Sequence, residues 1–313
     1  MDDSKTVKIL DHGYVKFIDS MGTDETIVEA ARMSTGKGFI SWDPYERCDG
    51  CGEVRFPSQE QKRGGIIQTC LNHKFVNYPD GDRGLLDNLW RNKHATPFEM
   101  VEFMFEVQAP IMVFREWHRH RTQSFNEFSA RYAQMPNIHY VPEESRFQKQ
   151  SAHNKQGSAE QVEDNLARQL REFIETEQEA IYKNYEGMVN KGLAKEVARL
   201  NTPVSRYSKM RVKTDLRNWL AFCNLRMRPG AQLEIRLFAN VVLDFIKQVC
   251  PKTVFLFEEY DLYGCYLSRT ELNILRRNVG IGSLELDAQA DGLSGTKLKE
   301  FIRKIEHGGK TIL

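Results

Sequence analysis

The sequence predicts an α+β fold in which a central β-sheet is flanked by long α-helices. Apolar residues alternate with mostly polar ones over residues 101–107, which is the pattern of a half-buried strand. Residues 216–223 and 235–249 carry apolar side chains at helical spacing, and a long helix is expected at about 159–190. No Gly-x-Gly-x-x-Gly fingerprint follows a strand, so the sequence argues against a Rossmann fold.

Shorter elements follow from local signals along the chain. Residues 7–18 are expected to form a strand, a turn and a second strand, and Thr23 or Asp24 can cap the helix that comes next. Apolar side chains over residues 85–90 predict one buried helix face. Pro110 can open a further helix, because its fixed φ suits the first helical turn.

Two stretches of the chain look irregular. Residues 40–82 contain glycines and prolines that interrupt any long element, which indicates an insertion with little regular structure. Residues 145–161 are polar and are interpreted as a mobile loop. We therefore expect one domain at 1–258, which carries the insertion at about 40–82, and a C-terminal extension of unknown role at 259–313.

Composition excludes several classes of protein. Lys plus Arg is 44 and Asp plus Glu is 43, so the net charge of +1 gives no general attraction to nucleic acid or to an anionic membrane. No apolar run is long enough to span a bilayer, and the first residues lack the apolar core of a signal peptide. Six cysteines in 313 residues do not suggest a secreted disulfide scaffold. A cytoplasmic protein with reduced thiols is expected.

The insertion contains a set of residues that can bind a metal. Cys48-x-x-Cys51 is followed by Cys70-x-x-His73, a spacing that fits a tetrahedral zinc site with three cysteines and one histidine. A small segment with few apolar residues gains stability from such a structural ion. The alternative is a set of thiols without a metal, beside a surface histidine.

Residues 119–131 form the most polar strip of the chain and read Arg-His-Arg-Thr-Gln-Ser-Phe-Asn-Glu-Phe-Ser-Ala-Arg. Arginine forks bind phosphate or carboxylate in a bidentate way, and neighbouring hydroxyls suit a polar small molecule. A solvated helix face is one alternative, in which Ser124-x-x-Glu127 is a capping box. An RNA-binding strip is another, in which Phe125, Phe128 and Tyr132 stack bases.

The strip resembles, at every fixed position, the signature Arg-His-Arg-x-x-Ser-x-Asn-Glu-x-Ser-x-Arg of the flavin-dependent thymidylate synthases. Other segments are similar to that family and occur in the same order. They are Asp11–Gly13, Asp19–Gly22, Ala30–Ser34, His94–Glu99, Asn224–Arg226 and Ala231–Ile235.

The resemblance implies an enzyme that converts dUMP to dTMP. It implies FAD as the bound cofactor, NADPH as the reductant of the flavin, and methylene-tetrahydrofolate as the carbon donor. It also implies the fold of this family, and a homotetramer whose active sites are shared between subunits. The cofactor carries the redox chemistry in such an enzyme, and the protein supplies position and charge. No cysteine nucleophile is expected, because Cys223 and Cys250 fall on apolar helix faces.

The resemblance also implies roles for individual residues. Arg226 faces the uracil edge and polarises the ring, and His94 lies beside the flavin and the folate. The residues implied at FAD are Thr96, Arg119, His120, Arg121, Glu127, Asp215 and Arg217. The residues implied at dUMP are Glu116, Arg119, Glu127, Phe128, Ser129, Ala130, Arg131, Arg226 and, from a neighbouring subunit, Arg199.

Four positions depart from the family's usual residues. Glu116 stands where glutamine is usual, Asp215 and Ala221 stand where asparagine is common, and Gly230 replaces a frequent histidine. These departures concern flavin contacts and binding strength more than the type of reaction. A flavoprotein of this fold that has lost the synthase activity is therefore a further alternative, and a zinc-containing RNA-binding module remains the alternative from another class.

Overall fold

The computed structural model describes residues 5–56, 74–152 and 157–307. The chain divides into two compact units, Met1–Leu262 and Tyr263–Leu313. The second unit contains the helices α10 (Arg269–Asn278), α11 (Ile281–Ala290) and α12 (Gly295–His307). No helix among the described residues has the length and apolar character needed to cross a membrane.

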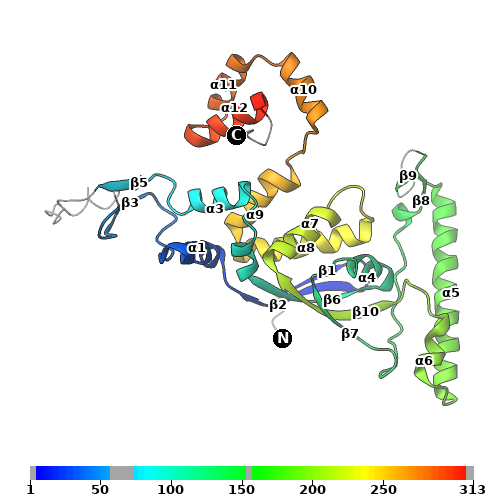
Figure 1. Cartoon of the computed structure of the whole chain (residues 1–313). Coiled ribbons are helices and arrows are strands. Elements are labelled where there is room, and N and C mark those ends of the chain that lie inside the picture. Colours follow the sequence, from blue (N-terminus) through cyan, green and yellow to red (C-terminus); the bar gives the residue numbers. More distant parts are fainter. Residues whose placement is uncertain (1–4, 57–73, 153–156, 308–313) are drawn as a thin grey trace. The chain divides into compact units, whose positions relative to one another are not determined.

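A five-stranded antiparallel sheet forms the centre of the first unit (Figure 1). Its longest ladder joins β6 and β10 over nine residue pairs, from Tyr207↔Pro110 to Asp215↔Glu102. In spatial order the strands are β1 (Thr6–Ile9), β2 (Gly13–Met21), β6 (Glu102–Pro110), β10 (Tyr207–Asp215) and β7 (Ser124–Glu127).

The two faces of the sheet differ in polarity, as the alternation in residues 101–107 predicted. Phe103, Phe105 and Val107 of β6 are fully buried on one face. On the other face ion pairs connect β6 and β10, and one of them joins Arg211 Nη2 to Glu106 Oε2 at 2.8 Å. An antiparallel sheet tolerates this arrangement, because only one of its faces needs to be covered.

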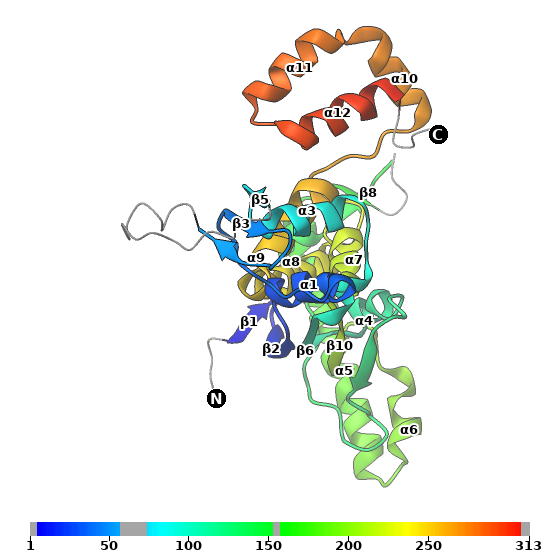
Figure 2. The same ribbon diagram turned by 60° about the vertical axis from the view of Figure 1, so that its left-hand side comes forward.

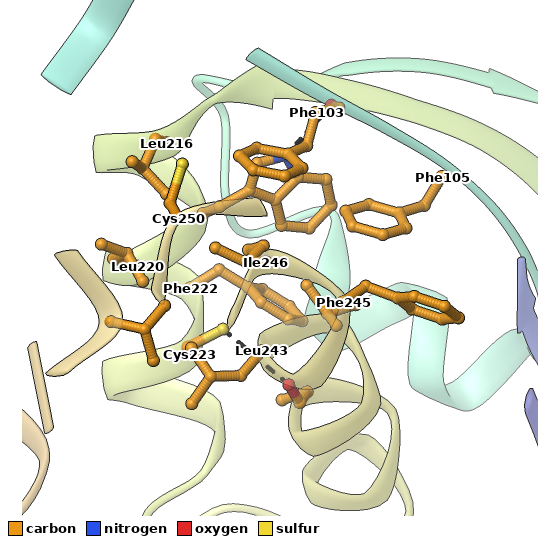
Figure 3. Close-up of a cluster of buried hydrophobic side chains, with 14 of the residues drawn as sticks. Phe103, Phe105, Leu216, Leu220, Phe222, Cys223, Leu243, Phe245, Ile246 and Cys250 are labelled. Atoms are coloured by element: carbon orange, nitrogen blue, oxygen red, sulfur yellow. Dashed lines mark hydrogen bonds between the residues drawn. The ribbon is translucent and has the colours of Figure 1, made fainter. Parts of the chain in front are cut away.

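Helices α7 (Leu216–Arg226) and α8 (Leu233–Val249) lie side by side over the apolar face (Figures 1 and 2). Figure 3 shows the core between helices and sheet, where side chains of α7 and α8 meet those of β6. The Trp219 ring meets Phe105 edge to face, with centroids 5.0 Å apart, and its indole N–H donates to the Phe103 carbonyl at 3.1 Å. Both predicted amphipathic helices are confirmed.

Among the other helices of the first unit, α1, α3, α4 and α9 add buried side chains to this core, whereas α5 and α6 pack around a second cluster that contains Tyr182, Tyr185 and Ala198. The helix α4 follows Pro110, as predicted, and α5 is the expected long helix. Their bounds are α1 (Asp24–Arg32), α3 (Arg83–Arg91), α4 (Ile111–Trp117), α5 (Asp164–Asn190), α6 (Lys195–Ala198) and α9 (Pro251–Phe257), with the short 3-10 helices Met33–Thr35, Thr96–Met100, Glu144–Arg146 and Arg199–Asn201.

The insertion is more regular than the sequence indicated. It contains a three-stranded antiparallel sheet of β3 (Tyr45–Cys48), β4 (Val54–Arg55) and β5 (Phe75–Tyr78). The fully buried Tyr45 anchors this sheet, because its hydroxyl donates to Asp82 at 2.9 Å and Asp82 forms an ion pair with Arg32 of α1. The prediction of little regular structure was wrong here, because this buried polar network joins residues distant in sequence.

One further prediction and one alternative interpretation were wrong for related reasons. The expected loop at 145–161 contains an antiparallel hairpin of β8 (Gln148–Gln150) and β9 (Ser158–Gln161). Ser124-x-x-Glu127 is not a capping box, because these residues form the strand β7 beside β10. Strand pairing is a tertiary interaction, and the local sequence signal did not contain it.

The aromatic core gives a direct test of this fold. Phe105→Ala should lower the free energy of unfolding by about 3–5 kcal/mol, because it leaves a cavity beside Trp219. Chemical denaturation followed by circular dichroism measures the change. The matched control is Val76→Ala, since Val76 is 46% exposed in β5. Equal destabilisation by the two variants would contradict the packing described.

Candidate active site

Arg226, the last residue of α7, is held by three hydrogen bonds. Its Nε donates to Nε2 of His120 at 3.0 Å. Its Nη1 donates to the Glu116 carboxylate at 2.9 Å, and its Nη2 donates to the Glu116 backbone carbonyl at 2.7 Å. The Arg226 side chain is only 13% exposed. These bonds fix both the position and the plane of the cation.

His120 accepts a hydrogen bond from a cation, so its ring must be neutral. Burial, together with the neighbouring charge of Arg226, lowers the pKa of His120 to about 4. The ring also packs edge to face against Phe222, with centroids 4.9 Å apart. His120 therefore positions Arg226 and contributes no charge near neutral pH.

Glu116 and Arg226 line a polar cavity of about 490 Å³. Gln232 and residues of the β8–β9 hairpin, including Lys149, form other parts of its wall. Burial raises the pKa of Glu116; the charge of Arg226 opposes this rise and the charge of Glu234 adds to it. The cavity thus presents a fixed cation and a carboxylate to a polar ligand.

A second cavity, of about 250 Å³, is lined by His94, Arg217 and Ala221 together with the apolar side chains of Trp90, Leu220 and Phe257. Arg217 Nη1 lies 2.5 Å from Glu99 Oε1. Each cavity is thus lined by an arginine of α7 that pairs with a glutamate, Arg217 with Glu99 here and Arg226 with Glu116 in the polar cavity. An apolar wall with a few polar groups suits a flat ring system.

The three arginines of the polar strip, Arg119, Arg121 and Arg131, are exposed. The guanidinium groups of Arg119 and Arg121 contact no carboxylate within the part of the chain that the structure describes. Thr96, which opens the 3-10 helix after His94, is exposed as well. Exposed cations without an internal partner are available to bind phosphate groups.

Residues 127–131 lie at the end of β7, and several of them are already engaged within the chain. The Ser208 hydroxyl donates to Glu127 at 2.7 Å, and the backbone N–H of Arg131 donates to the Ser129 hydroxyl at 3.3 Å. The Arg131 guanidinium lies 3.3 Å from the carboxylate of Glu196. This pair is half exposed and therefore weak, so a phosphate can replace the carboxylate.

Sequence comparison identifies the family. Residues 16–252 match the sequence model of the family described as "Thymidylate synthase complementing protein". A flavin-dependent thymidylate synthase of Thermus thermophilus is 37% identical over 312 residues, which cover 100% of both chains. Another flavin-dependent thymidylate synthase, of Wolbachia pipientis, is 37% identical over 270 residues and covers 86% of this chain and 82% of its own.

This chain belongs to the flavin-dependent thymidylate synthase family.

A solved structure also matches the fold. It is the UMP/dUMP methylase PolB from Streptomyces cacaoi bound with 5-Br UMP, with a TM-score of 0.63 and 26% sequence identity. The match covers 82% of this chain and 98% of that chain. The family and the fold are therefore those that the polar strip at 119–131 indicated.

Some residues that the resemblance implied lie where their side chains serve the fold. Asp215 caps α7, since it accepts from the Asn218 backbone at 2.9 Å and from the Asn218 side chain at 2.6 Å. Ala130 is 8% exposed and packs with Tyr185, while Phe128 packs against the same cluster. Phe125 packs against His118, with centroids 4.8 Å apart. The RNA-binding alternative required Phe125, Phe128 and Tyr132 to stack bases. Two of these three side chains, Phe125 and Phe128, instead pack within the chain.

Sequence reasoning missed one part of the site. Glu234, 1% exposed, accepts from Arg146 at 2.8 Å and from Gln232 at 2.7 Å. This network joins the segment before β8 to the start of α8, beside the polar cavity. The family segment Ala231–Ile235 contained Gln232 and Glu234, but nothing in the sequence indicated Arg146 as their partner.

The cysteines bear on two expectations, the lack of a cysteine nucleophile and the zinc site in the insertion. Burial raises the pKa of the Cys223 and Cys250 thiols, so neither forms a thiolate nucleophile readily. In the insertion, the Cys51 backbone N–H donates to Cys48 Sγ at 3.5 Å. Cys70 and His73, the other two predicted zinc ligands, lie outside the described residues.

The lowered pKa of His120 gives a pH-dependent prediction. The unfolded imidazole binds a proton below about pH 6.5, whereas the folded one binds it only near pH 4. Its contribution to stability is therefore present above pH 6.5 and is lost as the pH falls toward 4. The denaturation midpoints of wild type and His120→Asn, measured over this pH range, give the difference in stability between the two proteins. This difference should become smaller as the pH falls. A constant difference would contradict a neutral His120.

Proposed function

We propose that this protein methylates dUMP reductively to form dTMP, without a cysteine nucleophile. The observation that carries the proposal is Arg226, a guanidinium fixed by three hydrogen bonds at the wall of a polar cavity, in a chain of this family. A solved relative of the same fold binds a brominated pyrimidine nucleotide, which supports a nucleotide substrate.

FAD is the proposed cofactor, and the cationic groups around the site fit its phosphates. We assign Arg119, His120 and Arg121 to the flavin nucleotide, with Thr96, Glu127 and Asp215 as polar contacts. Arg217 and His94 line the smaller cavity, whose apolar wall suits a ring system. When bound and reduced by NADPH, FAD supplies the hydride, and methylene-tetrahydrofolate supplies the carbon.

The nucleotide is assigned to the end of β7 and to the polar cavity. Ser129 and Arg131 bind its phosphate, while Glu127, Phe128 and Ala130 border it. Arg199, also assigned to dUMP, comes from a neighbouring subunit in this proposal. The exchange of Glu196 for phosphate at Arg131 requires little energy, since the existing ion pair is half exposed.

Arg226 then activates the base. A preorganised cation beside a ring oxygen stabilises negative charge as it develops there, and this raises the nucleophilicity of C5. His120 and Glu116 hold the guanidinium before substrate arrives, so little reorganisation is needed when the charge appears.

We also propose a homotetramer in the cytoplasm, with no membrane or nucleic-acid partner. A stripe of exposed apolar residues on α5, Leu166, Leu170 and Phe173, supports association with other copies of the chain. Sharing of the site between subunits explains how Arg199 reaches a nucleotide bound at Arg131 of another copy.

Turnover tests the function and the role of Arg226 together. Purified protein, assayed anaerobically with dUMP, methylene-tetrahydrofolate, NADPH and FAD, should form dTMP. Arg226→Ala should lower kcat by about 100- to 1,000-fold, because it removes one preorganised donor. The matched control is Arg228→Ala, since Arg228 follows the end of α7, is exposed and, among the described residues, bonds only Asn224 through its side chain.

The flavin absorbance of each variant shows whether the cofactor is still bound. Equal loss of rate in both variants would contradict the role of Arg226. Bound flavin without dTMP formation by the wild type would favour a family member that has lost the synthase activity.

Zinc in the insertion is a separate proposal. The N–H···S contact between Cys51 and Cys48 at the end of β3 brings these two cysteines together, and Cys70 and His73 complete a four-ligand set by sequence spacing. Metal analysis should find one zinc ion per chain. Cys51→Ser should lose it, and Cys265→Ser, which alters an exposed cysteine of the second unit, should keep it. The same zinc content in both variants would contradict the site.

A further inference from the structure

Lys93 adopts a backbone conformation that favours glycine. Its φ is 56°, and it is one of two described residues other than glycine with a positive φ. It lies just after α3, where its N–H donates to the Trp90 carbonyl at 3.0 Å and the His94 N–H donates to the Leu89 carbonyl at 2.9 Å. These two bonds form a Schellman motif, whose left-handed position is usually a glycine. A lysine is strained there, which points to a role for its side chain.

The side chain of Lys93 belongs to the wall of the smaller cavity. Its ammonium donates to the two carboxylate oxygens of Asp261, at 2.9 and 3.2 Å, and Asp261 also accepts from the Trp90 indole N–H at 2.8 Å. The ammonium lies 5.6 Å from the centre of the Trp90 ring. Lys93, Asp261 and Trp90 line the cavity together with His94. Asp261 and Trp90 therefore hold a cation at this wall.

The ammonium keeps capacity for a ligand. It has three donors, and Asp261, its only acceptor among the described residues, uses at most two of them. The Lys93 side chain is 59% exposed, whereas that of Asp261 is 9% exposed. The cation thus lies where the cavity meets solvent, beside the apolar wall of Trp90, Leu220 and Phe257. A matching ligand carries a ring system for the wall and an anionic group for the ammonium.

We propose that Lys93 binds a carboxylate of the glutamate tail of the folate co-substrate. This inference rests on the proposed function, since it takes methylene-tetrahydrofolate as the carbon donor. A reduced folate joins a pterin to a benzoyl group and a glutamate, so one molecule supplies both the rings and the carboxylates. FAD, NADPH and dUMP carry phosphates instead, and the exposed Arg119 and Arg121 are already assigned to the flavin nucleotide.

Two purely structural roles of Lys93 lead to different expectations. If Lys93 only ended α3, glycine would replace it without loss, because glycine adopts a positive φ freely. If Lys93 only neutralised Asp261, Asp261→Asn would make the lysine dispensable, since the amide oxygen still accepts from Trp90. A lysine that binds the folate tail is needed in both backgrounds, and only for ligands that carry the tail.

Anaerobic calorimetric titration of the FAD-loaded protein, with dUMP present, tests the proposal. The ligands are tetrahydrofolate and tetrahydropteroyl amide, in which a neutral amide replaces the glutamate. The proteins are wild type, Lys93→Gly, Lys93→Arg and the double variant of Lys93→Gly with Asp261→Asn. The control is Lys183→Ala, because Lys183 is an exposed lysine of α5 that pairs with Glu179 at 3.6 Å, outside the cavity.

The wild type should bind tetrahydrofolate about 5- to 10-fold more tightly than the amide. This effect lies between that of an exposed ion pair and that of a hydrogen bond to a charged group. Lys93→Gly should lose the preference, with or without Asp261→Asn, and should keep its affinity for the amide. Lys93→Arg should retain most of the preference, because it keeps the cation, and Lys183→Ala should retain all of it.

Three results with the variants overturn the proposal. A preference that persists in Lys93→Gly means that another group binds the tail. A preference that is lost in Lys93→Gly and restored by Asp261→Asn assigns Lys93 to the neutralisation of Asp261. Loss of FAD from Lys93→Gly, with the preference unchanged, assigns the cation to a flavin phosphate.

The wild type alone separates this inference from the proposed function, and its titrations do not depend on the folding of any variant. If the wild type forms dTMP but binds tetrahydrofolate and the amide equally, the role of Lys93 is refuted and the proposed function stands. If the wild type forms no dTMP and binds neither ligand, both proposals fail.

Discussion

The packing of Trp219 against the β6–β10 ladder is the constraint on which the active site depends. This side chain joins α7 to the sheet through an aromatic contact with Phe105 and a hydrogen bond to the Phe103 backbone. Since Trp219 and Arg226 both belong to α7, the position of this helix on the sheet determines where its last residue, Arg226, lies. The same sheet leads directly from β6 into α4, which ends just before the turn that carries His120. Core packing thus brings the two partners of one hydrogen bond together.

The polar cluster at this junction is arranged around a single cation. A buried arginine without partners is costly, and Glu116 and His120 reduce this cost in different ways. Glu116 neutralises the charge, whereas His120 accepts a hydrogen bond without adding charge. Glu234 forms its own ion pair with Arg146, which limits its repulsion of Glu116. The cluster therefore holds Arg226 in place while leaving two of its donors to a ligand.

The departures from the family pattern have different structural consequences. Asp215 keeps a structural role, because a carboxylate caps a helix as well as an asparagine does. Ala221 lines the smaller cavity and Gly230 lines the larger one, so each leaves its cavity wall without the polar side chain that is common in the family at that position. Glu116, like Asp215, adds a negative charge, and it places this charge beside Arg226.

The sequence by itself determined the family and the main elements, and it predicted which arginines belong to the site. Short-range signals sufficed for this, because apolar periodicity fixes α7, α8 and β6, and the strip at 119–131 is long and specific. Only the tertiary structure decided which side chains meet. The contacts of Arg226 with Glu116 and His120, the network of Glu234 with Arg146, and the sheet in the insertion all join residues far apart in the chain. Such contacts depend on how the elements pack, and local patterns carry no record of that packing.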